Sequence, residues 1–152
     1  MDIVMVRAFN HIGPGQADIF VIADFCRQVV LAEAGKKEPV ISVGNLAAER
    51  DFTDVRDIVR AYSALMKSGK SGQTYNVGSG KARSIQSMLD MILEKSSVKI
   101  EVKQDSSRMR PSDVPTIAAD ITRIKNDTGW QPEIALSDTI DDIIAYWRKK
   151  EI

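Results

Sequence analysis

Apolar residues recur along the chain in blocks that alternate between the spacing of strands and that of helices. Ile3 to Phe9 is a nearly continuous apolar run, the pattern of a strand buried on both faces of a parallel sheet. After a Gly/Pro loop, Asp18 is placed to cap a helix that Gly35 ends. Val40 to Val43 predicts a short strand after it. The apolar positions expected to face inward from this helix are Ile22, Phe25, Val29 and Ala32.

The same alternation continues through the middle of the chain. Asp54 is the candidate cap of a second helix that stops at Gly69, Thr74 to Val77 reads as a strand, and Ser84 caps a third helix. An alternating strand, Val98 to Val102, follows. The second helix is expected to bury Ile58, Val59, Tyr62, Leu65 and Met66, and the third Ile85, Met88, Leu89, Ile92 and Leu93.

The last third begins with a polar loop from Gln104 to Pro115, which has no periodicity, and ends with helices over Ile121 to Asp127 and Ser137 to Lys149. The fold class is therefore mixed α/β, with residues 1–152 as one domain. A parallel strand needs neighbours joined by crossover connections, and nothing in the chain precedes Ile3 to Phe9 to supply them. We therefore expect the chain to be the carboxy-terminal part of a longer protein.

Composition narrows the possible partners and the compartment. Lys+Arg 21 balances Asp+Glu 21, so no net charge favours nucleic acid or a membrane surface as a partner. With only Cys26 and His11, the chain has neither a disulfide framework nor a Cys/His metal site. No apolar stretch approaches the ~18 residues of a membrane helix. These features predict a cytoplasmic protein.

Asn10 and His11 form the first polar cluster, directly after the predicted first strand. In open α/β sheets, ligands bind beyond the carboxyl ends of the strands, so this junction is a candidate site. An equally good interpretation is that Asn10 caps a turn and His11 is a surface group.

The charged run from Arg50 to Asp57 forms the second cluster, and it leads into the second helix. Most such runs are solvated faces with local ion pairs that contribute little. Arg50 is the exception, because a guanidinium before a strand-to-helix turn can bind a phosphate with two parallel hydrogen bonds.

The third cluster lies in the long polar loop and contains Arg108, Arg110 and Asp113. An arginine there could hold a diphosphate and the carboxylate a hydroxylated ring. Long loops without structure of their own are disproportionately functional, which favours this interpretation over an ordinary surface loop.

The chain lacks a visible catalytic apparatus. No GxGxxG follows a strand, and the only Tyr-x-x-x-Lys pair, Tyr146 with Lys150, lies at the end of the last helix. His11 has no Ser or Cys nucleophile with a recognisable elbow. Catalysis by this chain alone is therefore not expected.

Five motifs in order resemble the second half of the extended short-chain dehydrogenases, the family of NAD-dependent nucleotide-sugar epimerases, dehydratases and reductases. They are Arg7 to Gln16 (RAFNHIGPGQ), Arg50 to Asp57 (RDFTDVRD), Tyr75 to Gly80 (YNVGSG), Arg110 to Asp113 (RPSD) and Thr128 to Pro132 (TGWQP). The resemblance implies the last Rossmann strands plus a small mixed α/β substrate domain. In this family the glycine-rich turn and the catalytic Tyr-x-x-x-Lys lie upstream, in the amino-terminal Rossmann domain.

The resemblance also implies roles for individual residues. Phe9 would contact the nicotinamide end of the NAD(P) cofactor through its backbone, and Asn10 would hold the sugar diphosphate. Arg50 and Arg110 would clamp the diphosphate, with Asp113 on a ribose hydroxyl. Val21 and Ile22 would lie along the substrate, and Ile41 and Val43 would flank the nucleobase. The cofactor would belong to the full-length parent, with none bound to this chain.

Within the family, Asn10 to Gln16 most resembles the GDP-6-deoxy-4-keto-mannose reductases. GDP-mannose 4,6-dehydratases have an arginine pair where this chain has Gly15-Gln16, and some epimerases have a tyrosine where it has Ile117. The implied parent therefore reduces the 4-keto group of a GDP-linked deoxyhexulose. The expected partners are this nucleotide sugar, the amino-terminal Rossmann domain and, without that domain, a second copy of the chain. The alternative is a free-standing, non-catalytic module that binds a nucleotide or a protein.

Overall fold

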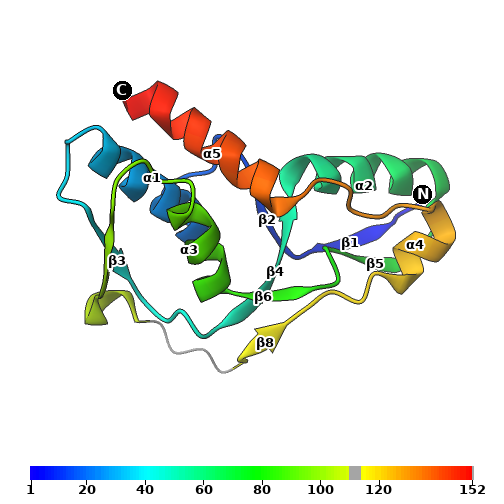
Figure 1. Cartoon of the computed structure of the whole chain (residues 1–152). Helices are drawn as coiled ribbons and strands as arrows, with labels where there is room; N and C mark the ends of the chain where they lie inside the picture. Colours follow the sequence, from blue (N-terminus) through cyan, green and yellow to red (C-terminus); the bar gives the residue numbers. More distant parts are fainter. Residues whose placement is uncertain (110–113, 152) are drawn as a thin grey trace.

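The computed structural model describes residues 1–109 and 114–151, which form two lobes on either side of a central sheet (Figure 1). The helical lobe contains α1 (Val21–Glu33), α3 (Ile85–Leu93), α5 (Leu136–Glu151) and the parallel pair β3 (Val40–Val43) and β7 (Glu101–Gln104). The strand lobe contains the parallel pair β1 (Met5–Ala8) and β5 (Thr74–Val77), with α2 (Val55–Ser68) and α4 (Thr122–Thr128).

The central sheet is built from β2 (Asn10–Ile12), β4 (Glu49–Asp54), β6 (Ala82–Ser84) and β8 (Thr116–Ile117). β4 pairs in parallel with β2 and β8 and antiparallel with β6. A 3-10 turn, η1 (Ser106–Arg108), follows β7. The mixed α/β class is confirmed, and the helices of the helical lobe gather on one side of the central sheet.

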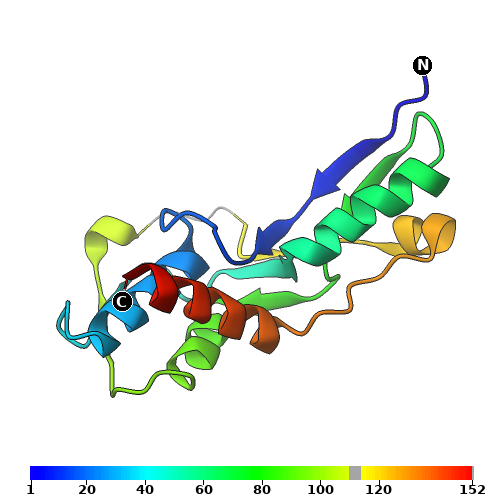
Figure 2. The same ribbon diagram turned by 90° about the horizontal axis from the view of Figure 1, so that it is seen from above.

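The apolar run at the start of the chain differs from the expectation. It divides at Phe9 into β1 and β2, which pair with different strands, β5 and β4. β1 thus has a parallel neighbour within this chain, and its residues are exposed rather than buried on both faces, as Met5 (49%) and Val6 (38%) show. β1 lies along the outside of the strand lobe (Figure 2), and no helix or strand formed by residues 1–109 or 114–151 covers its other edge.

The helical lobe encloses the larger hydrophobic cluster. Its helices α1, α3 and α5 pack together and also cover β3 and the inner face of β4. The inward positions predicted for α1 are buried, with Phe25 at 2% and Val29 at 0%. Side-chain bonds from α1 to α5 reinforce this packing, since Arg148 Nε donates to Glu33 at 2.9 Å and Arg27 Nε donates to Glu151 at 2.7 Å.

The strand lobe encloses a smaller cluster formed by Ile58, Ala61, Leu65, Tyr75, Val77, Ile124 and Trp130. The buried face predicted for α2 was right for Ile58 and Leu65 but wrong for three residues: Val59 (59% exposed), Tyr62 (41%) and Met66 (89%). These three follow one another at helical spacing, and Tyr62 and Met66 line a groove with Val4 and Val6 of the neighbouring β1 segment. An apolar stripe therefore remains exposed on α2, next to the outer edge of β1.

Helix starts were predicted with mixed success. Ser84 and Asp54 cap α3 and α2, since Ser84 Oγ accepts from Ser87 N at 3.0 Å and Asp54 Oδ1 from Arg56 N at 2.7 Å. Asp18 does not cap α1, which begins after Phe20 without a side-chain cap. Instead, Asp18 forms an ion pair with Arg27.

None of the helices in the described part of the chain combines the length and apolar character needed to span a bilayer.

Candidate functional site

Asn10 and Arg50 lie on the same face of the central sheet. In the parallel pair of β2 and β4, Asn10 is opposite Phe52, and Arg50 precedes Phe52 by two positions. Paired residues and residues two apart point to one face of a sheet, and these spacings place the Cα atoms of Asn10 and Arg50 within about 8 Å of each other. Phe52 is buried in the core of the helical lobe, so this face is the one that the lobe partly covers. The structure thus brings two predicted site residues together.

Phe9 connects the two sheets at this point. Its backbone N–H donates to Val77 O of β5 at 2.8 Å, and its carbonyl accepts from His11 Nδ1 at 3.1 Å. Phe9 therefore stands where the chain passes from the strand lobe to the central sheet. Its backbone contact with a nicotinamide ring stays a prediction.

Arg50 is half-buried, and backbone carbonyl groups hold its guanidinium. Nη1 donates to Glu49 O at 2.6 Å and to Pro115 O at 3.2 Å. The Pro115 carbonyl also accepts from Glu49 N at 2.8 Å. These contacts orient the guanidinium at the start of β4, next to the end of the polar loop.

The residues predicted to lie along the sugar and the base belong to α1 and β3. Val21 is exposed in the first turn of α1, so its side chain is accessible to a ligand. Ile22 (1%), Ile41 (0%) and Val43 (2%) are buried in the hydrophobic core. In this conformation their side chains could not contact a substrate, so any contact would be made through backbone atoms. Their predicted roles remain untested.

The polar loop from Gln104 to Pro115 contacts α1 near its start and β4 at its end. At its start, Arg108 Nη1 forms an ion pair with Asp24 of α1 at 2.5 Å, and a Cβ atom on Gly44 would meet the Arg108 carbonyl at 2.3 Å. At its end, Pro115 contacts β4. The loop therefore joins the first turn of α1 to the strand that carries Arg50. Arg110 and Asp113 lie outside the described residues.

Buried carboxylates support this site from the other face of β4. Asp51 is 1% exposed and accepts from Ser79 N (2.7 Å), Gly80 N (2.9 Å) and Ala119 N (2.9 Å). A Cβ atom at residue 78 would approach Asp51 Oδ2 to 2.8 Å, so only glycine fits there. Asp51 thereby fixes the Gly78–Gly80 loop and residue 119 against β4.

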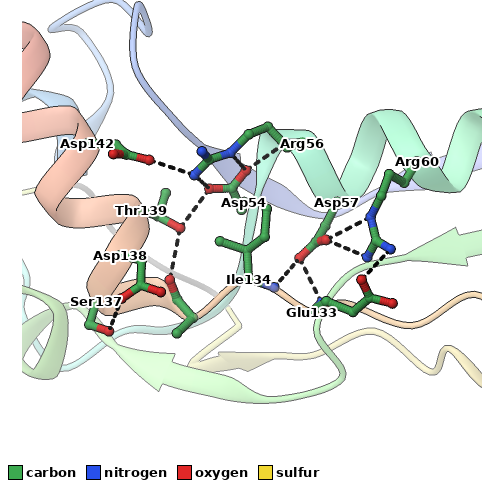
Figure 3. A network of polar contacts seen from close by, with 11 residues as sticks. Asp54, Arg56, Asp57, Arg60, Glu133, Ile134, Ser137, Asp138, Thr139 and Asp142 are labelled. Carbon is green, nitrogen blue, oxygen red and sulfur yellow. Dashed lines mark hydrogen bonds and ion pairs between the residues drawn. The ribbon is translucent and has the colours of Figure 1, made fainter.

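Asp54 joins α2 to α5 (Figure 3). Its side chain is fully buried and accepts from Thr139 Oγ1 at 2.7 Å and from Arg56 Nη2 at 2.7 Å. Arg56 also pairs with Asp142 of α5 at 2.8 Å. Burial alone would raise the pKa of Asp54, but the hydrogen bonds from Arg56 and Thr139 lower it overall.

Asp57 holds the segment that precedes α5 (Figure 3). Its carboxylate accepts from Glu133 N and Ile134 N, both at 3.0 Å, and from Arg60 Nη2 at 2.6 Å. The expectation of a solvated charged face for the run from Arg50 to Asp57 is therefore wrong. Asp51, Asp54 and Asp57 recur at every third position and are all buried, because each anchors a different segment.

A phosphate cradle for NAD(P) is not formed by the described residues. The Ser79 and Gly80 amides, which a glycine-rich loop could offer to a phosphate, both donate to Asp51. Within the described ranges, no group of three His, Cys, Asp or Glu side chains is arranged to hold a metal ion. The described residues therefore do not offer the glycine-rich amide cradle in which the pyrophosphate of a dinucleotide usually binds.

Comparison with known proteins agrees with this geometry. Residues 1–143 match the family model described as GDP-mannose 4,6 dehydratase. The chain is 35% identical over 148 residues to the GDP-6-deoxy-D-mannose reductase of Pseudomonas aeruginosa, covering 97% of this chain and 49% of that protein. It is 29% identical over 127 residues to the GDP-6-deoxy-D-talose 4-dehydrogenase of Aggregatibacter actinomycetemcomitans, covering 84% and 42%.

Among solved structures, RMD from Pseudomonas aeruginosa complexed with NADPH superimposes with a TM-score of 0.91 at 35% identity, covering 97% of this chain and 48% of that one. The chain therefore spans about half the length of the relatives it matches. The matched fold is the carboxy-terminal part of an extended short-chain dehydrogenase.

Proposed function

Because the chain belongs to the GDP-mannose 4,6-dehydratase family, we propose that it is the nucleotide-sugar-binding part of an NAD(P)-dependent reductase acting on a GDP-linked 6-deoxyhexulose. The observation that carries the proposal is the placement of Arg50 and Asn10 on one face of the central sheet. The similarity to a GDP-6-deoxy-D-mannose reductase favours 4-keto reduction over dehydration. A cytoplasmic location stays part of the proposal.

In this mechanism the residues of the chain bind and orient the substrate. Arg50 provides a fixed cation for the diphosphate, Asn10 an amide for the sugar end, and α1 an accessible apolar side chain at Val21. A nicotinamide cofactor held by the amino-terminal half would supply the hydride. Holding the 4-keto carbon over that cofactor contributes much of the rate, so the anion site would affect turnover as well as affinity.

The exposed stripe of α2 and the outer edge of β1 supply the second part of the proposal. Val6, Tyr62 and Met66 are apolar and exposed, and β1 is paired on one edge only within the described chain. Such a surface is typical of an interface. We propose that it packs against the amino-terminal Rossmann domain, and that it drives self-association of the chain when that domain is absent.

Ligand titration of the purified chain tests the proposal. With GDP-mannose at millimolar concentrations, amide chemical shifts should change around Asn10, Arg50 and Val21. With NADPH, fluorescence should show no saturable binding at micromolar concentrations, because Asp51 occupies the Ser79 and Gly80 amides. Micromolar NADPH binding would contradict the proposal that the amino-terminal half holds the cofactor. Absence of any GDP-mannose response would contradict the proposed substrate site.

A further inference from the structure

The two faces of the β1–β5 pair differ in character. Val6 of β1 is opposite Tyr75 of β5. The next pair in the parallel register is Arg7 with Asn76. Successive residues of a strand point to opposite faces, so these two pairs lie on different faces. The face of Tyr75 is the one that α2 covers (Figure 1), because Tyr75 is fully buried in the cluster to which α2 contributes.

The face of Arg7 and Asn76 borders an open pocket with a volume of about 680 Å³. Its other lining residues come from α4, from the segment before α4 and from the turn between α2 and β5. Every side chain that lines it is polar, and none belongs to α2. This face of the parallel pair is therefore polar and open to solvent.

The charges around this polar pocket are largely satisfied within the chain. Three contacts hold the charged side chains beside Arg7: Lys70 Nζ to Asp127 Oδ1 (2.6 Å), Arg123 Nη1 to Thr74 O (2.8 Å) and Thr122 N to Asp120 Oδ1 (2.9 Å). Arg7 differs from them. It is exposed, and its side chain forms no ion pair or hydrogen bond with any residue of 1–109 or 114–151.

A covering element on this face would have to bring an acid for Arg7. Parallel sheets occur almost only with both faces covered, usually by the helices that connect their strands. The chain spans about half the length of the relatives that it matches, so the other half supplies the candidate cover. Taking a guanidinium out of water is strongly unfavourable unless a carboxylate pairs with it. The chemistry of the cover follows from this cost.

We infer that a helix of the amino-terminal half lies on the polar face of the β1–β5 pair and that one of its carboxylates binds Arg7. This inference rests on the proposed function, which places the amino-terminal half against the α2 stripe and the outer edge of β1, and it adds a contact on the opposite face. A guanidinium and a carboxylate can form two parallel hydrogen bonds, which would orient the helix. Beside Arg7, Asn76 Nδ2 donates to Asp120 O at 3.3 Å, so its Oδ1 can accept from the same helix.

Chemical labelling of arginine tests whether this face is covered. The chain alone and the full-length protein are treated with an arginine-specific dicarbonyl reagent, at concentrations at which light scattering shows the chain to be a monomer. Arg7 should react readily in the chain alone and be protected in the full-length protein. Arg148 is the control, because it pairs with Glu33 inside the chain and should react alike in both. Equal reactivity of Arg7 in the two forms would overturn the inference.

Denaturation of variants tests whether a carboxylate pairs with Arg7. Arg7→Gln should lower the urea midpoint of the full-length protein and leave that of the chain alone unchanged. The loss should correspond to about a hundredfold in the unfolding equilibrium, as for a broken buried ion pair. Arg148→Gln is the matched control and should lower both midpoints alike, because both of its partners lie in the chain.

Charge exchange identifies the partner of Arg7. In full-length Arg7→Glu, the acidic residues of the amino-terminal half are replaced by lysine one at a time, and one replacement should restore the midpoint. Restoration by none of them would overturn the inference, as would an unchanged midpoint for Arg7→Gln. Protection of Arg7 that appears only as the concentration of the chain rises, and not in the full-length protein, would overturn it in favour of a second copy.

These outcomes are independent of the substrate site. If the full-length protein shows no response to GDP-mannose while Arg7 is protected and has an acidic partner, the proposed substrate site fails and the inference stands. If the protein binds GDP-mannose while Arg7 stays reactive, the inference alone is overturned.

Discussion

The two lobes bury their apolar surface to different extents. The helical lobe covers its strands with α1, α3 and α5 and cross-links α1 to α5 through Arg148–Glu33 and Arg27–Glu151. The strand lobe buries a smaller cluster and leaves an apolar stripe exposed on α2 beside β1. This difference is the basis for our proposal that the strand lobe, and not the helical lobe, packs against the amino-terminal Rossmann domain.

The strand lobe is tied to the rest of the molecule by buried polar contacts. Asp54 and Asp57 at the start of α2 bind α5 and the segment before it (Figure 3). Asp51 binds the loop after β5. These carboxylates give the strand lobe a defined position although its apolar core is small. The site residues Phe9, Asn10 and Arg50 lie where the two lobes meet.

The largest contrast is expected from truncating one large side chain in each lobe. Phe25→Ala, in the core of the helical lobe, should lower the free energy of unfolding by about 3 to 5 kcal/mol because it leaves a cavity. Tyr62→Ala, on the exposed stripe, should change it by less than about 1 kcal/mol. Urea denaturation followed by circular dichroism measures both. The comparison is made at a protein concentration at which light scattering shows a monomer, where equal losses would contradict the exposure of the stripe.

Removing the buried carboxylate that connects α2 to α5 should also lower the free energy of unfolding, but by less than the truncation of Phe25. Asp54→Ala should cost about 3 kcal/mol, because Thr139 loses its acceptor and Arg56 its buried partner. Asp142→Ala is the matched control, since Asp142 also pairs with Arg56 but is 47% exposed, and its loss should cost under about 1 kcal/mol. A loss for Asp142→Ala as large as for Asp54→Ala would contradict a special role for the buried carboxylate.

The lowered pKa of Asp54 also predicts that the contact between α2 and α5 weakens at low pH. Because its pKa is lower in the folded than in the unfolded chain, its contribution is present above the ordinary value of 3.8 and is lost as pH falls below it. Stability should therefore decline below about pH 4, and the decline should be shallower in Asp54→Asn. Denaturation midpoints between pH 6 and pH 2.5 measure this slope. An identical slope in the variant would show that other carboxylates dominate.

The smallest effect on stability, but a clear one on association, is expected at the exposed stripe. If this surface drives self-association, Met66→Glu should lower the average mass measured by light scattering while changing the unfolding free energy by less than about 0.5 kcal/mol. The same charge at another exposed position, Lys149→Glu on α5, serves as the control. A monomeric unmodified chain with slow amide exchange throughout Ile3 to Phe9 would contradict the prediction.

Periodicity predicted the helices and the strands β3 and β5 because their patterns are local. It did not predict β4, which is mostly polar, or β6 and β8, which have only three and two residues. The pairing of these strands depends on contacts between distant segments. The exposed face of α2 was also mispredicted, since Val59, Tyr62 and Met66 have the spacing of a buried face but are not covered by any segment that the structure describes.

The candidate site was identified largely through motifs. Arg50 and Asn10 were singled out from their positions near predicted strands, the family resemblance then implied their roles, and the structure places them together. The buried carboxylates were missed because a charged run is ordinarily solvated, although the three-residue spacing of Asp51, Asp54 and Asp57 was a visible signal.

The most direct test of the central claim, that the region where the lobes meet binds a nucleotide sugar through Arg50, is a titration of Arg50→Ala with GDP-mannose. Hydrogen bonds to charged groups contribute about 1.5 to 3 kcal/mol, so affinity should fall roughly tenfold to a hundredfold. Arg56→Ala is a poor control because Arg56 holds Asp54 and α5 together. Arg7→Ala serves instead and should bind like the unmodified chain, whereas equal affinities for Arg50→Ala and Arg7→Ala would contradict the assignment of the site.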